Sequence, residues 1–440
     1  MTRQLTHARH MQSHFHPQCY AIDFGTTNSL LAAASIDGVH APIALDPLAK
    51  DPSILRSVLY FPDATHCHYG ADALAQYVAH GMQGRLMRSV KKFLPSRSFV
   101  GTHVEERPMN LEDLIGALLG EMRARANRFF DADVTAVVLG RPARFSTDDG
   151  DDRYAEYRLE RAARIAGFRE VSFCAEPIAA ARDFRNTLAE PRTVLVGDFG
   201  GGTSDFTVMR MRAGDYDPTD VLAIGGVSVA GDAFDAAIMR HHVARHFGSE
   251  VRYRVPMGHN VLTMPTSLSE KLCSPADASL LRSQDALSFL RNVRDWSLGE
   301  DDRRVMDQLF TFVEDRLGFA VFEAIESAKR TLSEANLACV QFSYPTIEVS
   351  EPIERVAFEQ SSQSKTAAIV AELDATLARA RLEPASIDIV CCTGGTARLP
   401  ALSNALALRF GRKKLTEFRS FHSVIHGLAE HAHARLRGEA

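Results

Sequence analysis

The chain has 440 residues, of which 45% are hydrophobic and 24% charged, and its formal net charge at pH 7 is -5. A chain of this length and apolar content buries a full core and forms more than one domain or lobe, which excludes an intrinsically disordered protein. The small negative charge does not indicate nucleic acid as a partner, and a membrane is not expected either, because no run of about 18 apolar residues occurs.

The cysteines are scattered, and none of them forms a Cys-x-x-Cys pair. This spacing disfavours a zinc or redox site built on cysteine. Adjacent Cys391 and Cys392 lie inside an apolar run. We therefore expect buried thiols, a reducing compartment and a cytoplasmic location.

Residues 1–18 are expected to form a disordered N-terminal tail. They lack the apolar segment of a secretory signal, and they contain no acidic residue. The second property would also suit a mitochondrial leader, but a frayed terminus is the favoured interpretation.

The first apolar run, CYAIDF at 19–24, predicts a strand. It ends in Asp23-Phe24-Gly25-Thr26-Thr27-Asn28, and further β-type sequence, SLLAAAS, follows where a helix would otherwise begin. A Gly- and Thr-rich segment between two strands indicates the tip of a hairpin.

A second segment of the same kind comes later in the chain. The strand-like run TVLVGDF at 193–199 passes through Asp198-Phe199-Gly200-Gly201-Gly202-Thr203-Ser204-Asp205 into FTVMRMR. Between the two tips lie a strand-like TAVVLGRPA at 135–143 and a helical pattern at 153–168. This alternation indicates an α/β fold. The recurring tip predicts an internal repeat, with two related lobes that face one cleft.

The two tips have the composition of a phosphate and metal site. Glycines let backbone amides converge on phosphate oxygens, and the hydroxyls of Thr26, Thr27 and Thr203 can add donors. Asp23 and Asp198 can hold Mg²⁺, most readily through its waters. The alternative is a pair of tight turns capped by Asp, which is less favoured for two tips than for one. Neither a P-loop nor a dinucleotide-binding glycine motif occurs in the sequence.

Three later segments bear on organisation and binding. Residues 247–312 show little periodicity and predict an elaborated subdomain. FEAIESAKRTLS at 322–333 predicts a helix with Glu326, Lys329 and Arg330 on one face. This face could contact a nucleoside, or it could be an ordinary solvent-exposed surface with salt bridges. IDIVCCTGGTARLP at 387–400 predicts a strand, a close-approach turn at Gly394 and Gly395, and a helix. A nucleoside could pack on this turn, although a plain β-to-α turn would look the same.

Together these segments resemble the nucleotide-binding domain of the DnaK-type heat-shock chaperone family, and most closely its short YegD-like members, which lack a substrate-binding domain. The resemblance covers about Tyr20 to Gly427. It rests on motifs in the family's order: AIDFGTTNS, GDFGGGTSDFTV, AEPIAAA, GGVSVAGDAFD, ESAKRTLS and GGTARLP. It implies a two-lobed actin-like ATPase fold built from duplicated ribonuclease H-like domains, with ATP or ADP and Mg²⁺ held between the lobes.

The resemblance also implies roles for individual residues. Asp23 and Asp198 would bind the metal, Lys91 of SVKKFLP would contact the γ-phosphate, and Glu176 and Asp205 would position or activate the attacking water. Thr203 would serve in both binding and catalysis. The remaining nucleotide contacts would come from Gly25, Thr26, Thr27, Asn28, Gly200, Gly201, Gly202, Gly231, Glu326, Lys329, Arg330, Ser333, Gly394, Gly395 and Arg398.

The expected domain organisation is lobe I at 19–190, with 415–440 packing back on it, and lobe II at 191–414, with the elaboration around 240–320. Two departures from the family pattern stand out. At 420–432 the sequence SFHSVIHGLAEHA lacks the aspartate that relatives usually carry. We therefore do not expect this segment to stabilise the closed, ATP-bound arrangement of the lobes. After Gly427 only a short segment remains, so no peptide-binding domain is expected.

The predicted function is a chaperone-like protein that binds ATP, hydrolyses it slowly with Mg²⁺ and acts as a nucleotide-dependent conformational switch. Client or co-chaperone proteins are its expected partners. Two alternatives on the same fold stay open at this point. One is an actin-like filament-forming ATPase and the other is a small-molecule kinase.

Overall fold

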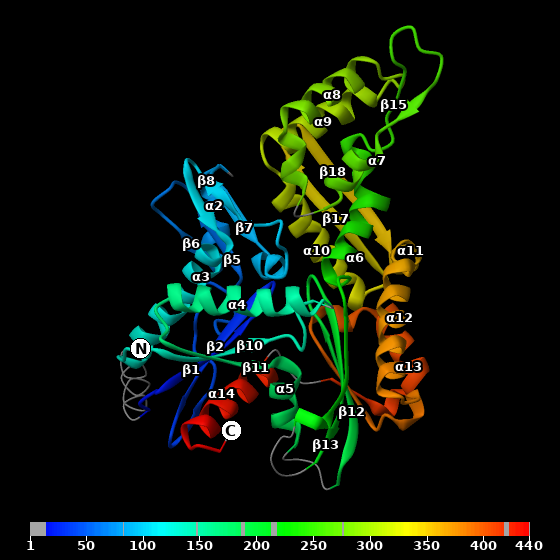
Figure 1. Ribbon diagram of the computed structural model, residues 1–440. Coiled ribbons are helices and arrows are strands. Elements are labelled where there is room, and N and C mark those ends of the chain that lie inside the picture. Colours follow the sequence, from blue (N-terminus) through cyan, green and yellow to red (C-terminus); the bar gives the residue numbers. More distant parts are fainter. Residues whose placement is uncertain are drawn as a thin grey trace, which may run out of the picture. The chain divides into compact units, whose positions relative to one another are not determined.

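The computed structural model describes residues 15–81, 83–146, 148–185, 190–212, 218–274, 277–417 and 422–439. The chain divides into two compact units. Unit 1 comprises Met1–Ser228, Ala371–Ala397 and Leu406–Ala440, and unit 2 comprises Val229–Val370 and Arg398–Ala405. Figure 1 traces the helices and strands of both units.

The first large sheet of unit 1 has the strand order β11-β10-β1-β2-β3, with the short β4 (Leu55–Arg56) paired to β2. β1 (Cys19–Phe24) is antiparallel to β2 (Asn28–Ser35), which is antiparallel to β3 (Gly38–His40). On the other side of β1, β10 (Ala136–Arg141) and β11 (Glu170–Ala175) continue the sheet in parallel. The hairpin predicted at the first tip is confirmed.

The second large sheet of unit 1 repeats this topology. Its order is β14-β13-β12-β19-β20, in which β12 (Arg192–Phe199), β13 (Ser204–Met211) and β14 (Val221–Val227) are successively antiparallel. On the other side of β12, β19 (Ile389–Thr393) is parallel to β12, and β20 (Leu415–Glu417) is parallel to β19. Each sheet thus has a central strand with a hairpin on one side and parallel strands on the other. The predicted internal repeat is confirmed.

The first sheet is covered by helices on both faces because its central strand is apolar on both. Side chains alternate across a strand, so Tyr20 and Ile22 of β1 join a core with α3 (Leu111–Phe130) and α4 (Asp149–Ile165). Ala21 instead joins a core with α5 (Glu176–Arg185) and the C-terminal helix α14 (His422–Leu436). The ribbon of Figure 1 shows α14 lying beside α5.

Gly427 allows the close approach of α14 to α5. A Cβ at this position would lie 1.8 Å from the Ala179 carbonyl oxygen. We expect Gly427→Ala to lower the free energy of unfolding by about 1–3 kcal/mol or more, because overpacking against backbone forces the helices apart. A chemical denaturation curve measures this loss.

Gly120, in the middle of α3, provides the matched control. A Cβ there would meet its nearest neighbours at 3.7 and 3.9 Å, which are ordinary contact distances. Gly120→Ala should therefore stabilise the protein by about 0.5–1 kcal/mol through its helix propensity. Equal effects of the two substitutions would contradict the packing described for Gly427.

A smaller sheet of unit 1, in the order β6-β5-β7, precedes the segment that carries Lys91. It consists of β5 (Val58–Phe61), β6 (His68–Tyr69) and β7 (Arg85–Arg88), with α2 (Gly70–Ala79) following β6. After β7, Ser89 takes a left-handed conformation, with φ of 56°. The 3-10 turn η1 (Val90–Phe93) then holds Lys91 in a buried position. The hairpin of β8 (Gly101–Val104) and β9 (Arg107–Asn110) leads on to α3.

Unit 2 is built around the hairpin of β17 (Leu337–Tyr344) and β18 (Ile347–Glu354), against which α10 (Gly318–Glu334) packs. The predicted helix at 322–333 is confirmed within α10. The unit also contains α6 (Gly231–Ile238), the π-helical turn η3 (Met239–Val243), α7 (Thr266–Leu272), α8 (Gln284–Asp295), α9 (Asp302–Glu314), α11 (Arg355–Ser361), and the short pair β15 (Arg252–Tyr253) and β16 (Leu262–Thr263). α12 (Gln363–Ala380) and α13 (Pro400–Phe410) contain residues of both units.

The N-terminal segment and one of the cysteines depart from the expectations. Of the predicted tail at 1–18, residues 1–14 lie outside the described part, and the Gln18 amide donates to the Ala34 carbonyl of β2 at 2.9 Å. All seven cysteines are free thiols. The expectation of burial is wrong for Cys339, which is exposed because it lies on the solvent-facing side of β17. Among the described residues, no helix combines the length and apolarity needed to cross a bilayer.

Candidate functional site

The first Gly- and Thr-rich tip is a tight turn between β1 and β2. The Gly25 amide donates to the Asn28 carbonyl at 3.0 Å, and a Cβ on Gly25 would lie 2.2 Å from that oxygen. Only glycine therefore fits at this position. Ser57 holds the tip from the neighbouring segment, because its hydroxyl donates to the Gly25 carbonyl at 2.7 Å and its amide donates to the Thr27 carbonyl at 2.8 Å.

The second tip repeats this backbone pattern. The Gly200 amide donates to the Thr203 carbonyl at 3.0 Å, as Gly25 does to the residue three positions further on. The Thr203 hydroxyl donates to Asp205 Oδ2 at 2.8 Å. The two tips also lie next to each other, since a Cβ on Gly202 would come within 3.7 Å of Thr26 Cγ2. The two tips are therefore close enough for one small anionic group to contact both.

Charged side chains gather behind the tips. Lys91 Nζ donates to Glu176 Oε1 at 2.8 Å, and both residues are buried, at 9% exposure. Asp23 is the penultimate residue of β1, and Asp198 holds the equivalent place in β12. Asp205 completes the cluster and, like both of these aspartates, interacts electrostatically with Lys91 and Glu176. The structure thus brings together the predicted metal and catalytic residues of unit 1.

This cluster carries more negative than positive charge. Desolvation and then the charge of Glu176 raise the pKa of Asp23 to about 8. Desolvation likewise raises the pKa of Asp198, and it raises the pKa of Asp205 to about 7. Burial alone would lower the pKa of the Lys91 ammonium, but the charges of Glu176 and Asp23 outweigh that effect and raise it. One ammonium group therefore does not balance the surrounding carboxylates.

A divalent cation fits such a site, because it would neutralise carboxylates that burial otherwise drives to bind protons. Asp23 and Asp198 are the residues that would hold it. Within the described residues, no group of three or more His, Cys, Asp or Glu side chains is placed to hold a metal ion. Mg²⁺ generally keeps several of its waters when it is bound by one or two carboxylates.

The predicted turn after β19 lies against the second tip. Gly394 has φ of 84°, and a Cβ on it would lie 2.1 Å from the Phe199 carbonyl, so glycine is required there. Thr393 Oγ1 donates to Asp198 Oδ1 at 2.7 Å, and Thr396 Oγ1 donates to the Gly200 carbonyl at 2.9 Å. Neither hydroxyl is among the residues predicted from the sequence. Their position on either side of the paired glycines is the signal that could have revealed them.

The predicted nucleoside contacts on α6 and α10, together with Arg398, belong to unit 2. Lys329 Nζ donates to Asp235 Oδ2 at 2.7 Å and to the Gly231 carbonyl at 3.1 Å. Glu326 and Arg330 form an ion pair at 2.6 Å one turn apart on α10. The Ser333 hydroxyl donates to the Lys329 carbonyl at 3.3 Å. Arg398 ends the 3-10 turn η7 (Gly395–Arg398) and belongs to unit 2 by its position.

Asp235 is the residue that sequence analysis overlooked in this group. It is 4% exposed, and its Oδ1 atom has no hydrogen-bond partner among the described residues. Desolvation raises its pKa to about 6, against the attraction of Lys329. The aspartate that ends GGVSVAGDAFD could have been suspected from its place within that motif.

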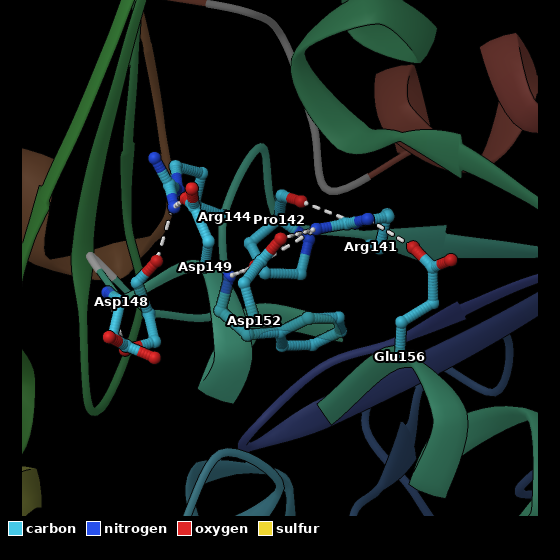
Figure 2. A network of polar contacts seen from close by, with 9 residues as sticks. Arg141, Pro142, Arg144, Asp148, Asp149, Asp152 and Glu156 are labelled. Atoms are coloured by element: carbon cyan, nitrogen blue, oxygen red, sulfur yellow. Dashed lines mark hydrogen bonds and ion pairs between the residues drawn. The ribbon is translucent and has the colours of Figure 1, made fainter. Parts of the chain in front are cut away.

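A network of arginines and carboxylates braces the strand next to Glu176. At the end of β10, Arg141 Nη2 pairs with Asp152 at 3.0 Å, and Nη1 donates to Glu156 one turn later on α4 (Figure 2). The Phe145 amide also donates to Asp152. Gly140 lies just before Arg141, and a Cβ on it would be 3.3 Å from Glu176 Cγ. The network therefore fixes α4 to the strand on which Glu176 packs.

The repeated sheets and the paired tips define a two-lobed ATPase fold of the actin-like class. The family model described as Hsp70 protein matches residues 74–262 and 315–438. This chain belongs to the Hsp70 family. ATPases of this family generally use ATP and ADP with Mg²⁺.

Curated relatives agree with this membership. The chain is 26% identical to a chaperone protein HscA homolog of Verminephrobacter eiseniae, over 94% of this chain and 57% of that protein. It is 28% identical to the homolog from Bordetella pertussis, over 72% of this chain and 49% of the relative. It is 30% identical to the one from Pseudomonas paraeruginosa, over 66% and 45%, respectively. The chain spans about half the length of these relatives.

Proposed function

We propose that this protein binds Mg·ATP, hydrolyses it slowly, and changes conformation with the state of the nucleotide. The observation that carries the proposal is the cluster of Asp23, Lys91, Glu176, Asp198 and Asp205 directly behind two adjacent glycine-rich tips. Converging amides suit phosphate oxygens, and the excess of carboxylates suits a divalent cation.

Each group would contribute to phosphoryl transfer through position and charge. Mg²⁺, when bound near Asp23 and Asp198, would neutralise charge on the phosphates. The amides of both tips would orient the triphosphate. Lys91, held by Glu176, would stabilise the negative charge that develops at the γ-phosphate. Glu176 and Asp205 are the carboxylates available to orient a water molecule and take its proton, and Thr203 fixes Asp205.

The nucleoside would be bound by the group on α10. Glu326, Arg330 and Ser333 offer donors and acceptors suited to ribose hydroxyls and a base edge. Lys329 would then act mainly through Asp235 and α6, to which it is already hydrogen-bonded. Gly394, Gly395 and Arg398 are the other residues proposed to contact the nucleoside.

The chaperone role is proposed from the family and from relatives that are named as chaperones. A nucleotide-dependent switch needs a partner whose affinity differs between the two nucleotide states. Crosslinking in ATP and in ADP should therefore capture different sets of partner proteins. The filament and kinase alternatives predict other outcomes: ATP-dependent sedimentation in the first case and faster ATP turnover with an added acceptor in the second.

Calorimetry tests the central step. Titration of Mg·ATP into the folded full chain should give a saturable heat, and Asp198→Asn should weaken the dependence of binding on Mg²⁺. If the folded wild-type protein takes up no Mg·ATP, the proposed function is wrong.

Thr393→Val is expected to raise the Mg²⁺ concentration for half-maximal ATP hydrolysis by roughly 10-fold to 100-fold. The substitution keeps the shape of the side chain and removes only the hydroxyl that donates to Asp198. Without this bond the carboxylate loses its fixed orientation. Single-turnover rates measured across a Mg²⁺ titration check the prediction.

Thr102→Val serves as its control. The Thr102 hydroxyl accepts a hydrogen bond from Arg85 at 2.9 Å on β8, among residues to which no nucleotide role is given. Its Mg²⁺ titration should match that of wild type. A Thr393→Val curve that also overlays the wild-type curve would show that Asp198 is positioned without this hydroxyl.

A further inference from the structure

The segment that follows Lys91 is an irregular loop wrapped around one buried cation. After η1 the chain runs through residues 94–100 before β8 begins. The Arg158 side chain, which comes from α4, is only 1% exposed inside this loop. A guanidinium group that is removed from water in this way needs hydrogen bonds to all sides.

The loop provides those hydrogen bonds from its backbone. Arg158 Nη1 donates to the Phe93 carbonyl at 3.2 Å and to the Ser96 carbonyl at 3.1 Å, and Nη2 donates to the Val100 carbonyl at 3.4 Å. Phe93 is the last residue of η1, so one of these bonds reaches the turn that carries Lys91. The guanidinium thus ties both ends of the loop to a single point.

Glu112 supplies the balancing charge. Its Oε1 accepts from Arg158 Nε at 3.1 Å and its Oε2 from Nη2 at 3.4 Å, while its own side chain is 12% exposed. Glu112 lies in the first turn of α3. The loop is therefore clamped between α3 and α4, and α4 is itself fixed to β10 by the network of Figure 2.

We propose that Arg158 is a positioning residue for Lys91. By clamping the 93–100 loop it fixes η1, and so it holds the Lys91 ammonium where it meets Glu176. Helix α4 therefore supports both Lys91 and Glu176. Its carboxylates in the network of Figure 2 brace the strand beside Glu176, and its Arg158 braces the turn that carries Lys91. The expected effect on ATP hydrolysis rests on the proposed function, whereas the expected effect on the position of Lys91 does not.

The structural consequence can be measured without nucleotide. In the full-chain Arg158→Met variant, backbone amides of residues 90–98 should exchange with deuterium at least about 10-fold faster than in wild type. Lys91 should also become reactive toward an amine-specific label, whereas neighbouring Lys92, already partly exposed, should change little. Unchanged exchange and labelling would overturn the proposal.

Arg123→Met is the matched control. Arg123 is another largely buried arginine of unit 1, and it pins a different loop, donating to the Val134 carbonyl at 2.8 Å and pairing with Asp133 at 2.5 Å. Its loss should speed exchange around residues 131–135 and leave 90–98 protected. Exchange at 90–98 that rises equally in both variants would mean that general loosening is responsible.

The rate of ATP hydrolysis provides a second test, because a residue that only stabilises the fold would not act through Lys91. Arg158→Met should slow single-turnover hydrolysis roughly 10-fold to 100-fold with little change in ATP affinity, because the reacting groups are misplaced. In a Lys91→Met background the same substitution should cause no further slowing, since coupled residues are not additive. Full slowing in both backgrounds would overturn the proposal.

Two outcomes need a further variant or measurement: a variant that does not fold and a wild type that does not hydrolyse ATP. If Arg158→Met alone does not fold, the double variant Arg158→Met/Glu112→Gln removes both charges and leaves no lone buried ion. If wild type fails to hydrolyse ATP, the proposed function fails, while exchange and labelling still decide whether Arg158 holds Lys91 in place.

Discussion

Glu176→Gln is expected to hydrolyse ATP at least roughly 100-fold more slowly than wild type in a single-turnover assay, with ATP affinity nearly unchanged. Glutamine keeps the size of the side chain and can still contact Lys91 Nζ through its amide oxygen. It cannot accept a proton from water, however, and it removes the charge that draws the Lys91 ammonium to a fixed place.

Glu170→Gln is the appropriate control, because Glu170 is the exposed first residue of the same strand, β11, that leads into Glu176. Its rate should equal that of wild type. If Glu176→Gln and wild type hydrolyse ATP at the same rate, Glu176 has no part in the chemistry, and Asp205 would become the first candidate for the base.

Gly395→Asp is expected to weaken ATP binding by about 100-fold or more, since like charges forced together cost several kcal/mol. A Cβ on Gly395 meets no other atom within 4 Å, so a side chain can start from this position without a clash at its Cβ. Its carboxylate would add negative charge next to a tip that is proposed to accept a polyanion. Calorimetry with Mg·ATP measures the affinity, and a thermal melt monitors the fold.

Two neighbouring substitutions separate charge from shape. Gly395→Ala should bind ATP nearly as well as wild type, because the position is open. Gly394→Ala should instead reduce stability, since its Cβ would clash with the Phe199 carbonyl and its φ of 84° disfavours alanine. Strong ATP binding by Gly395→Asp would contradict a nucleotide-binding role for this turn.

Much of the fold could be predicted because the informative patterns are local. Each Asp-Phe-Gly tip is flanked by strands on both sides, so a hairpin followed from neighbouring residues alone. The recurrence of that tip was enough to predict a repeat, and the two sheets share one strand order. The family resemblance then predicted the actin-like class, which the family match supports.

The missed residues have in common that their contacts span long stretches of sequence. Thr393 meets Asp198 across 195 positions, and Ser57 meets Gly25 across 32. Arg158 reaches Glu112 from 46 positions away. No periodicity or short motif records such a pairing, because it is decided by how strands and helices pack. The boundaries of the two lobes and the nucleoside contacts stay predictions, and Ser420 and Phe421 of the unusual C-terminal segment lie outside the described residues.

The duplicated sheet has a mechanical consequence. Asp23 comes from one copy of the sheet and Asp198 from the other, and the charge of Asp198 is one of the causes that raise the pKa of Asp23. A cation held by both carboxylates would therefore join the two copies of the sheet at this point. Loss of that cation would remove this link between the two copies.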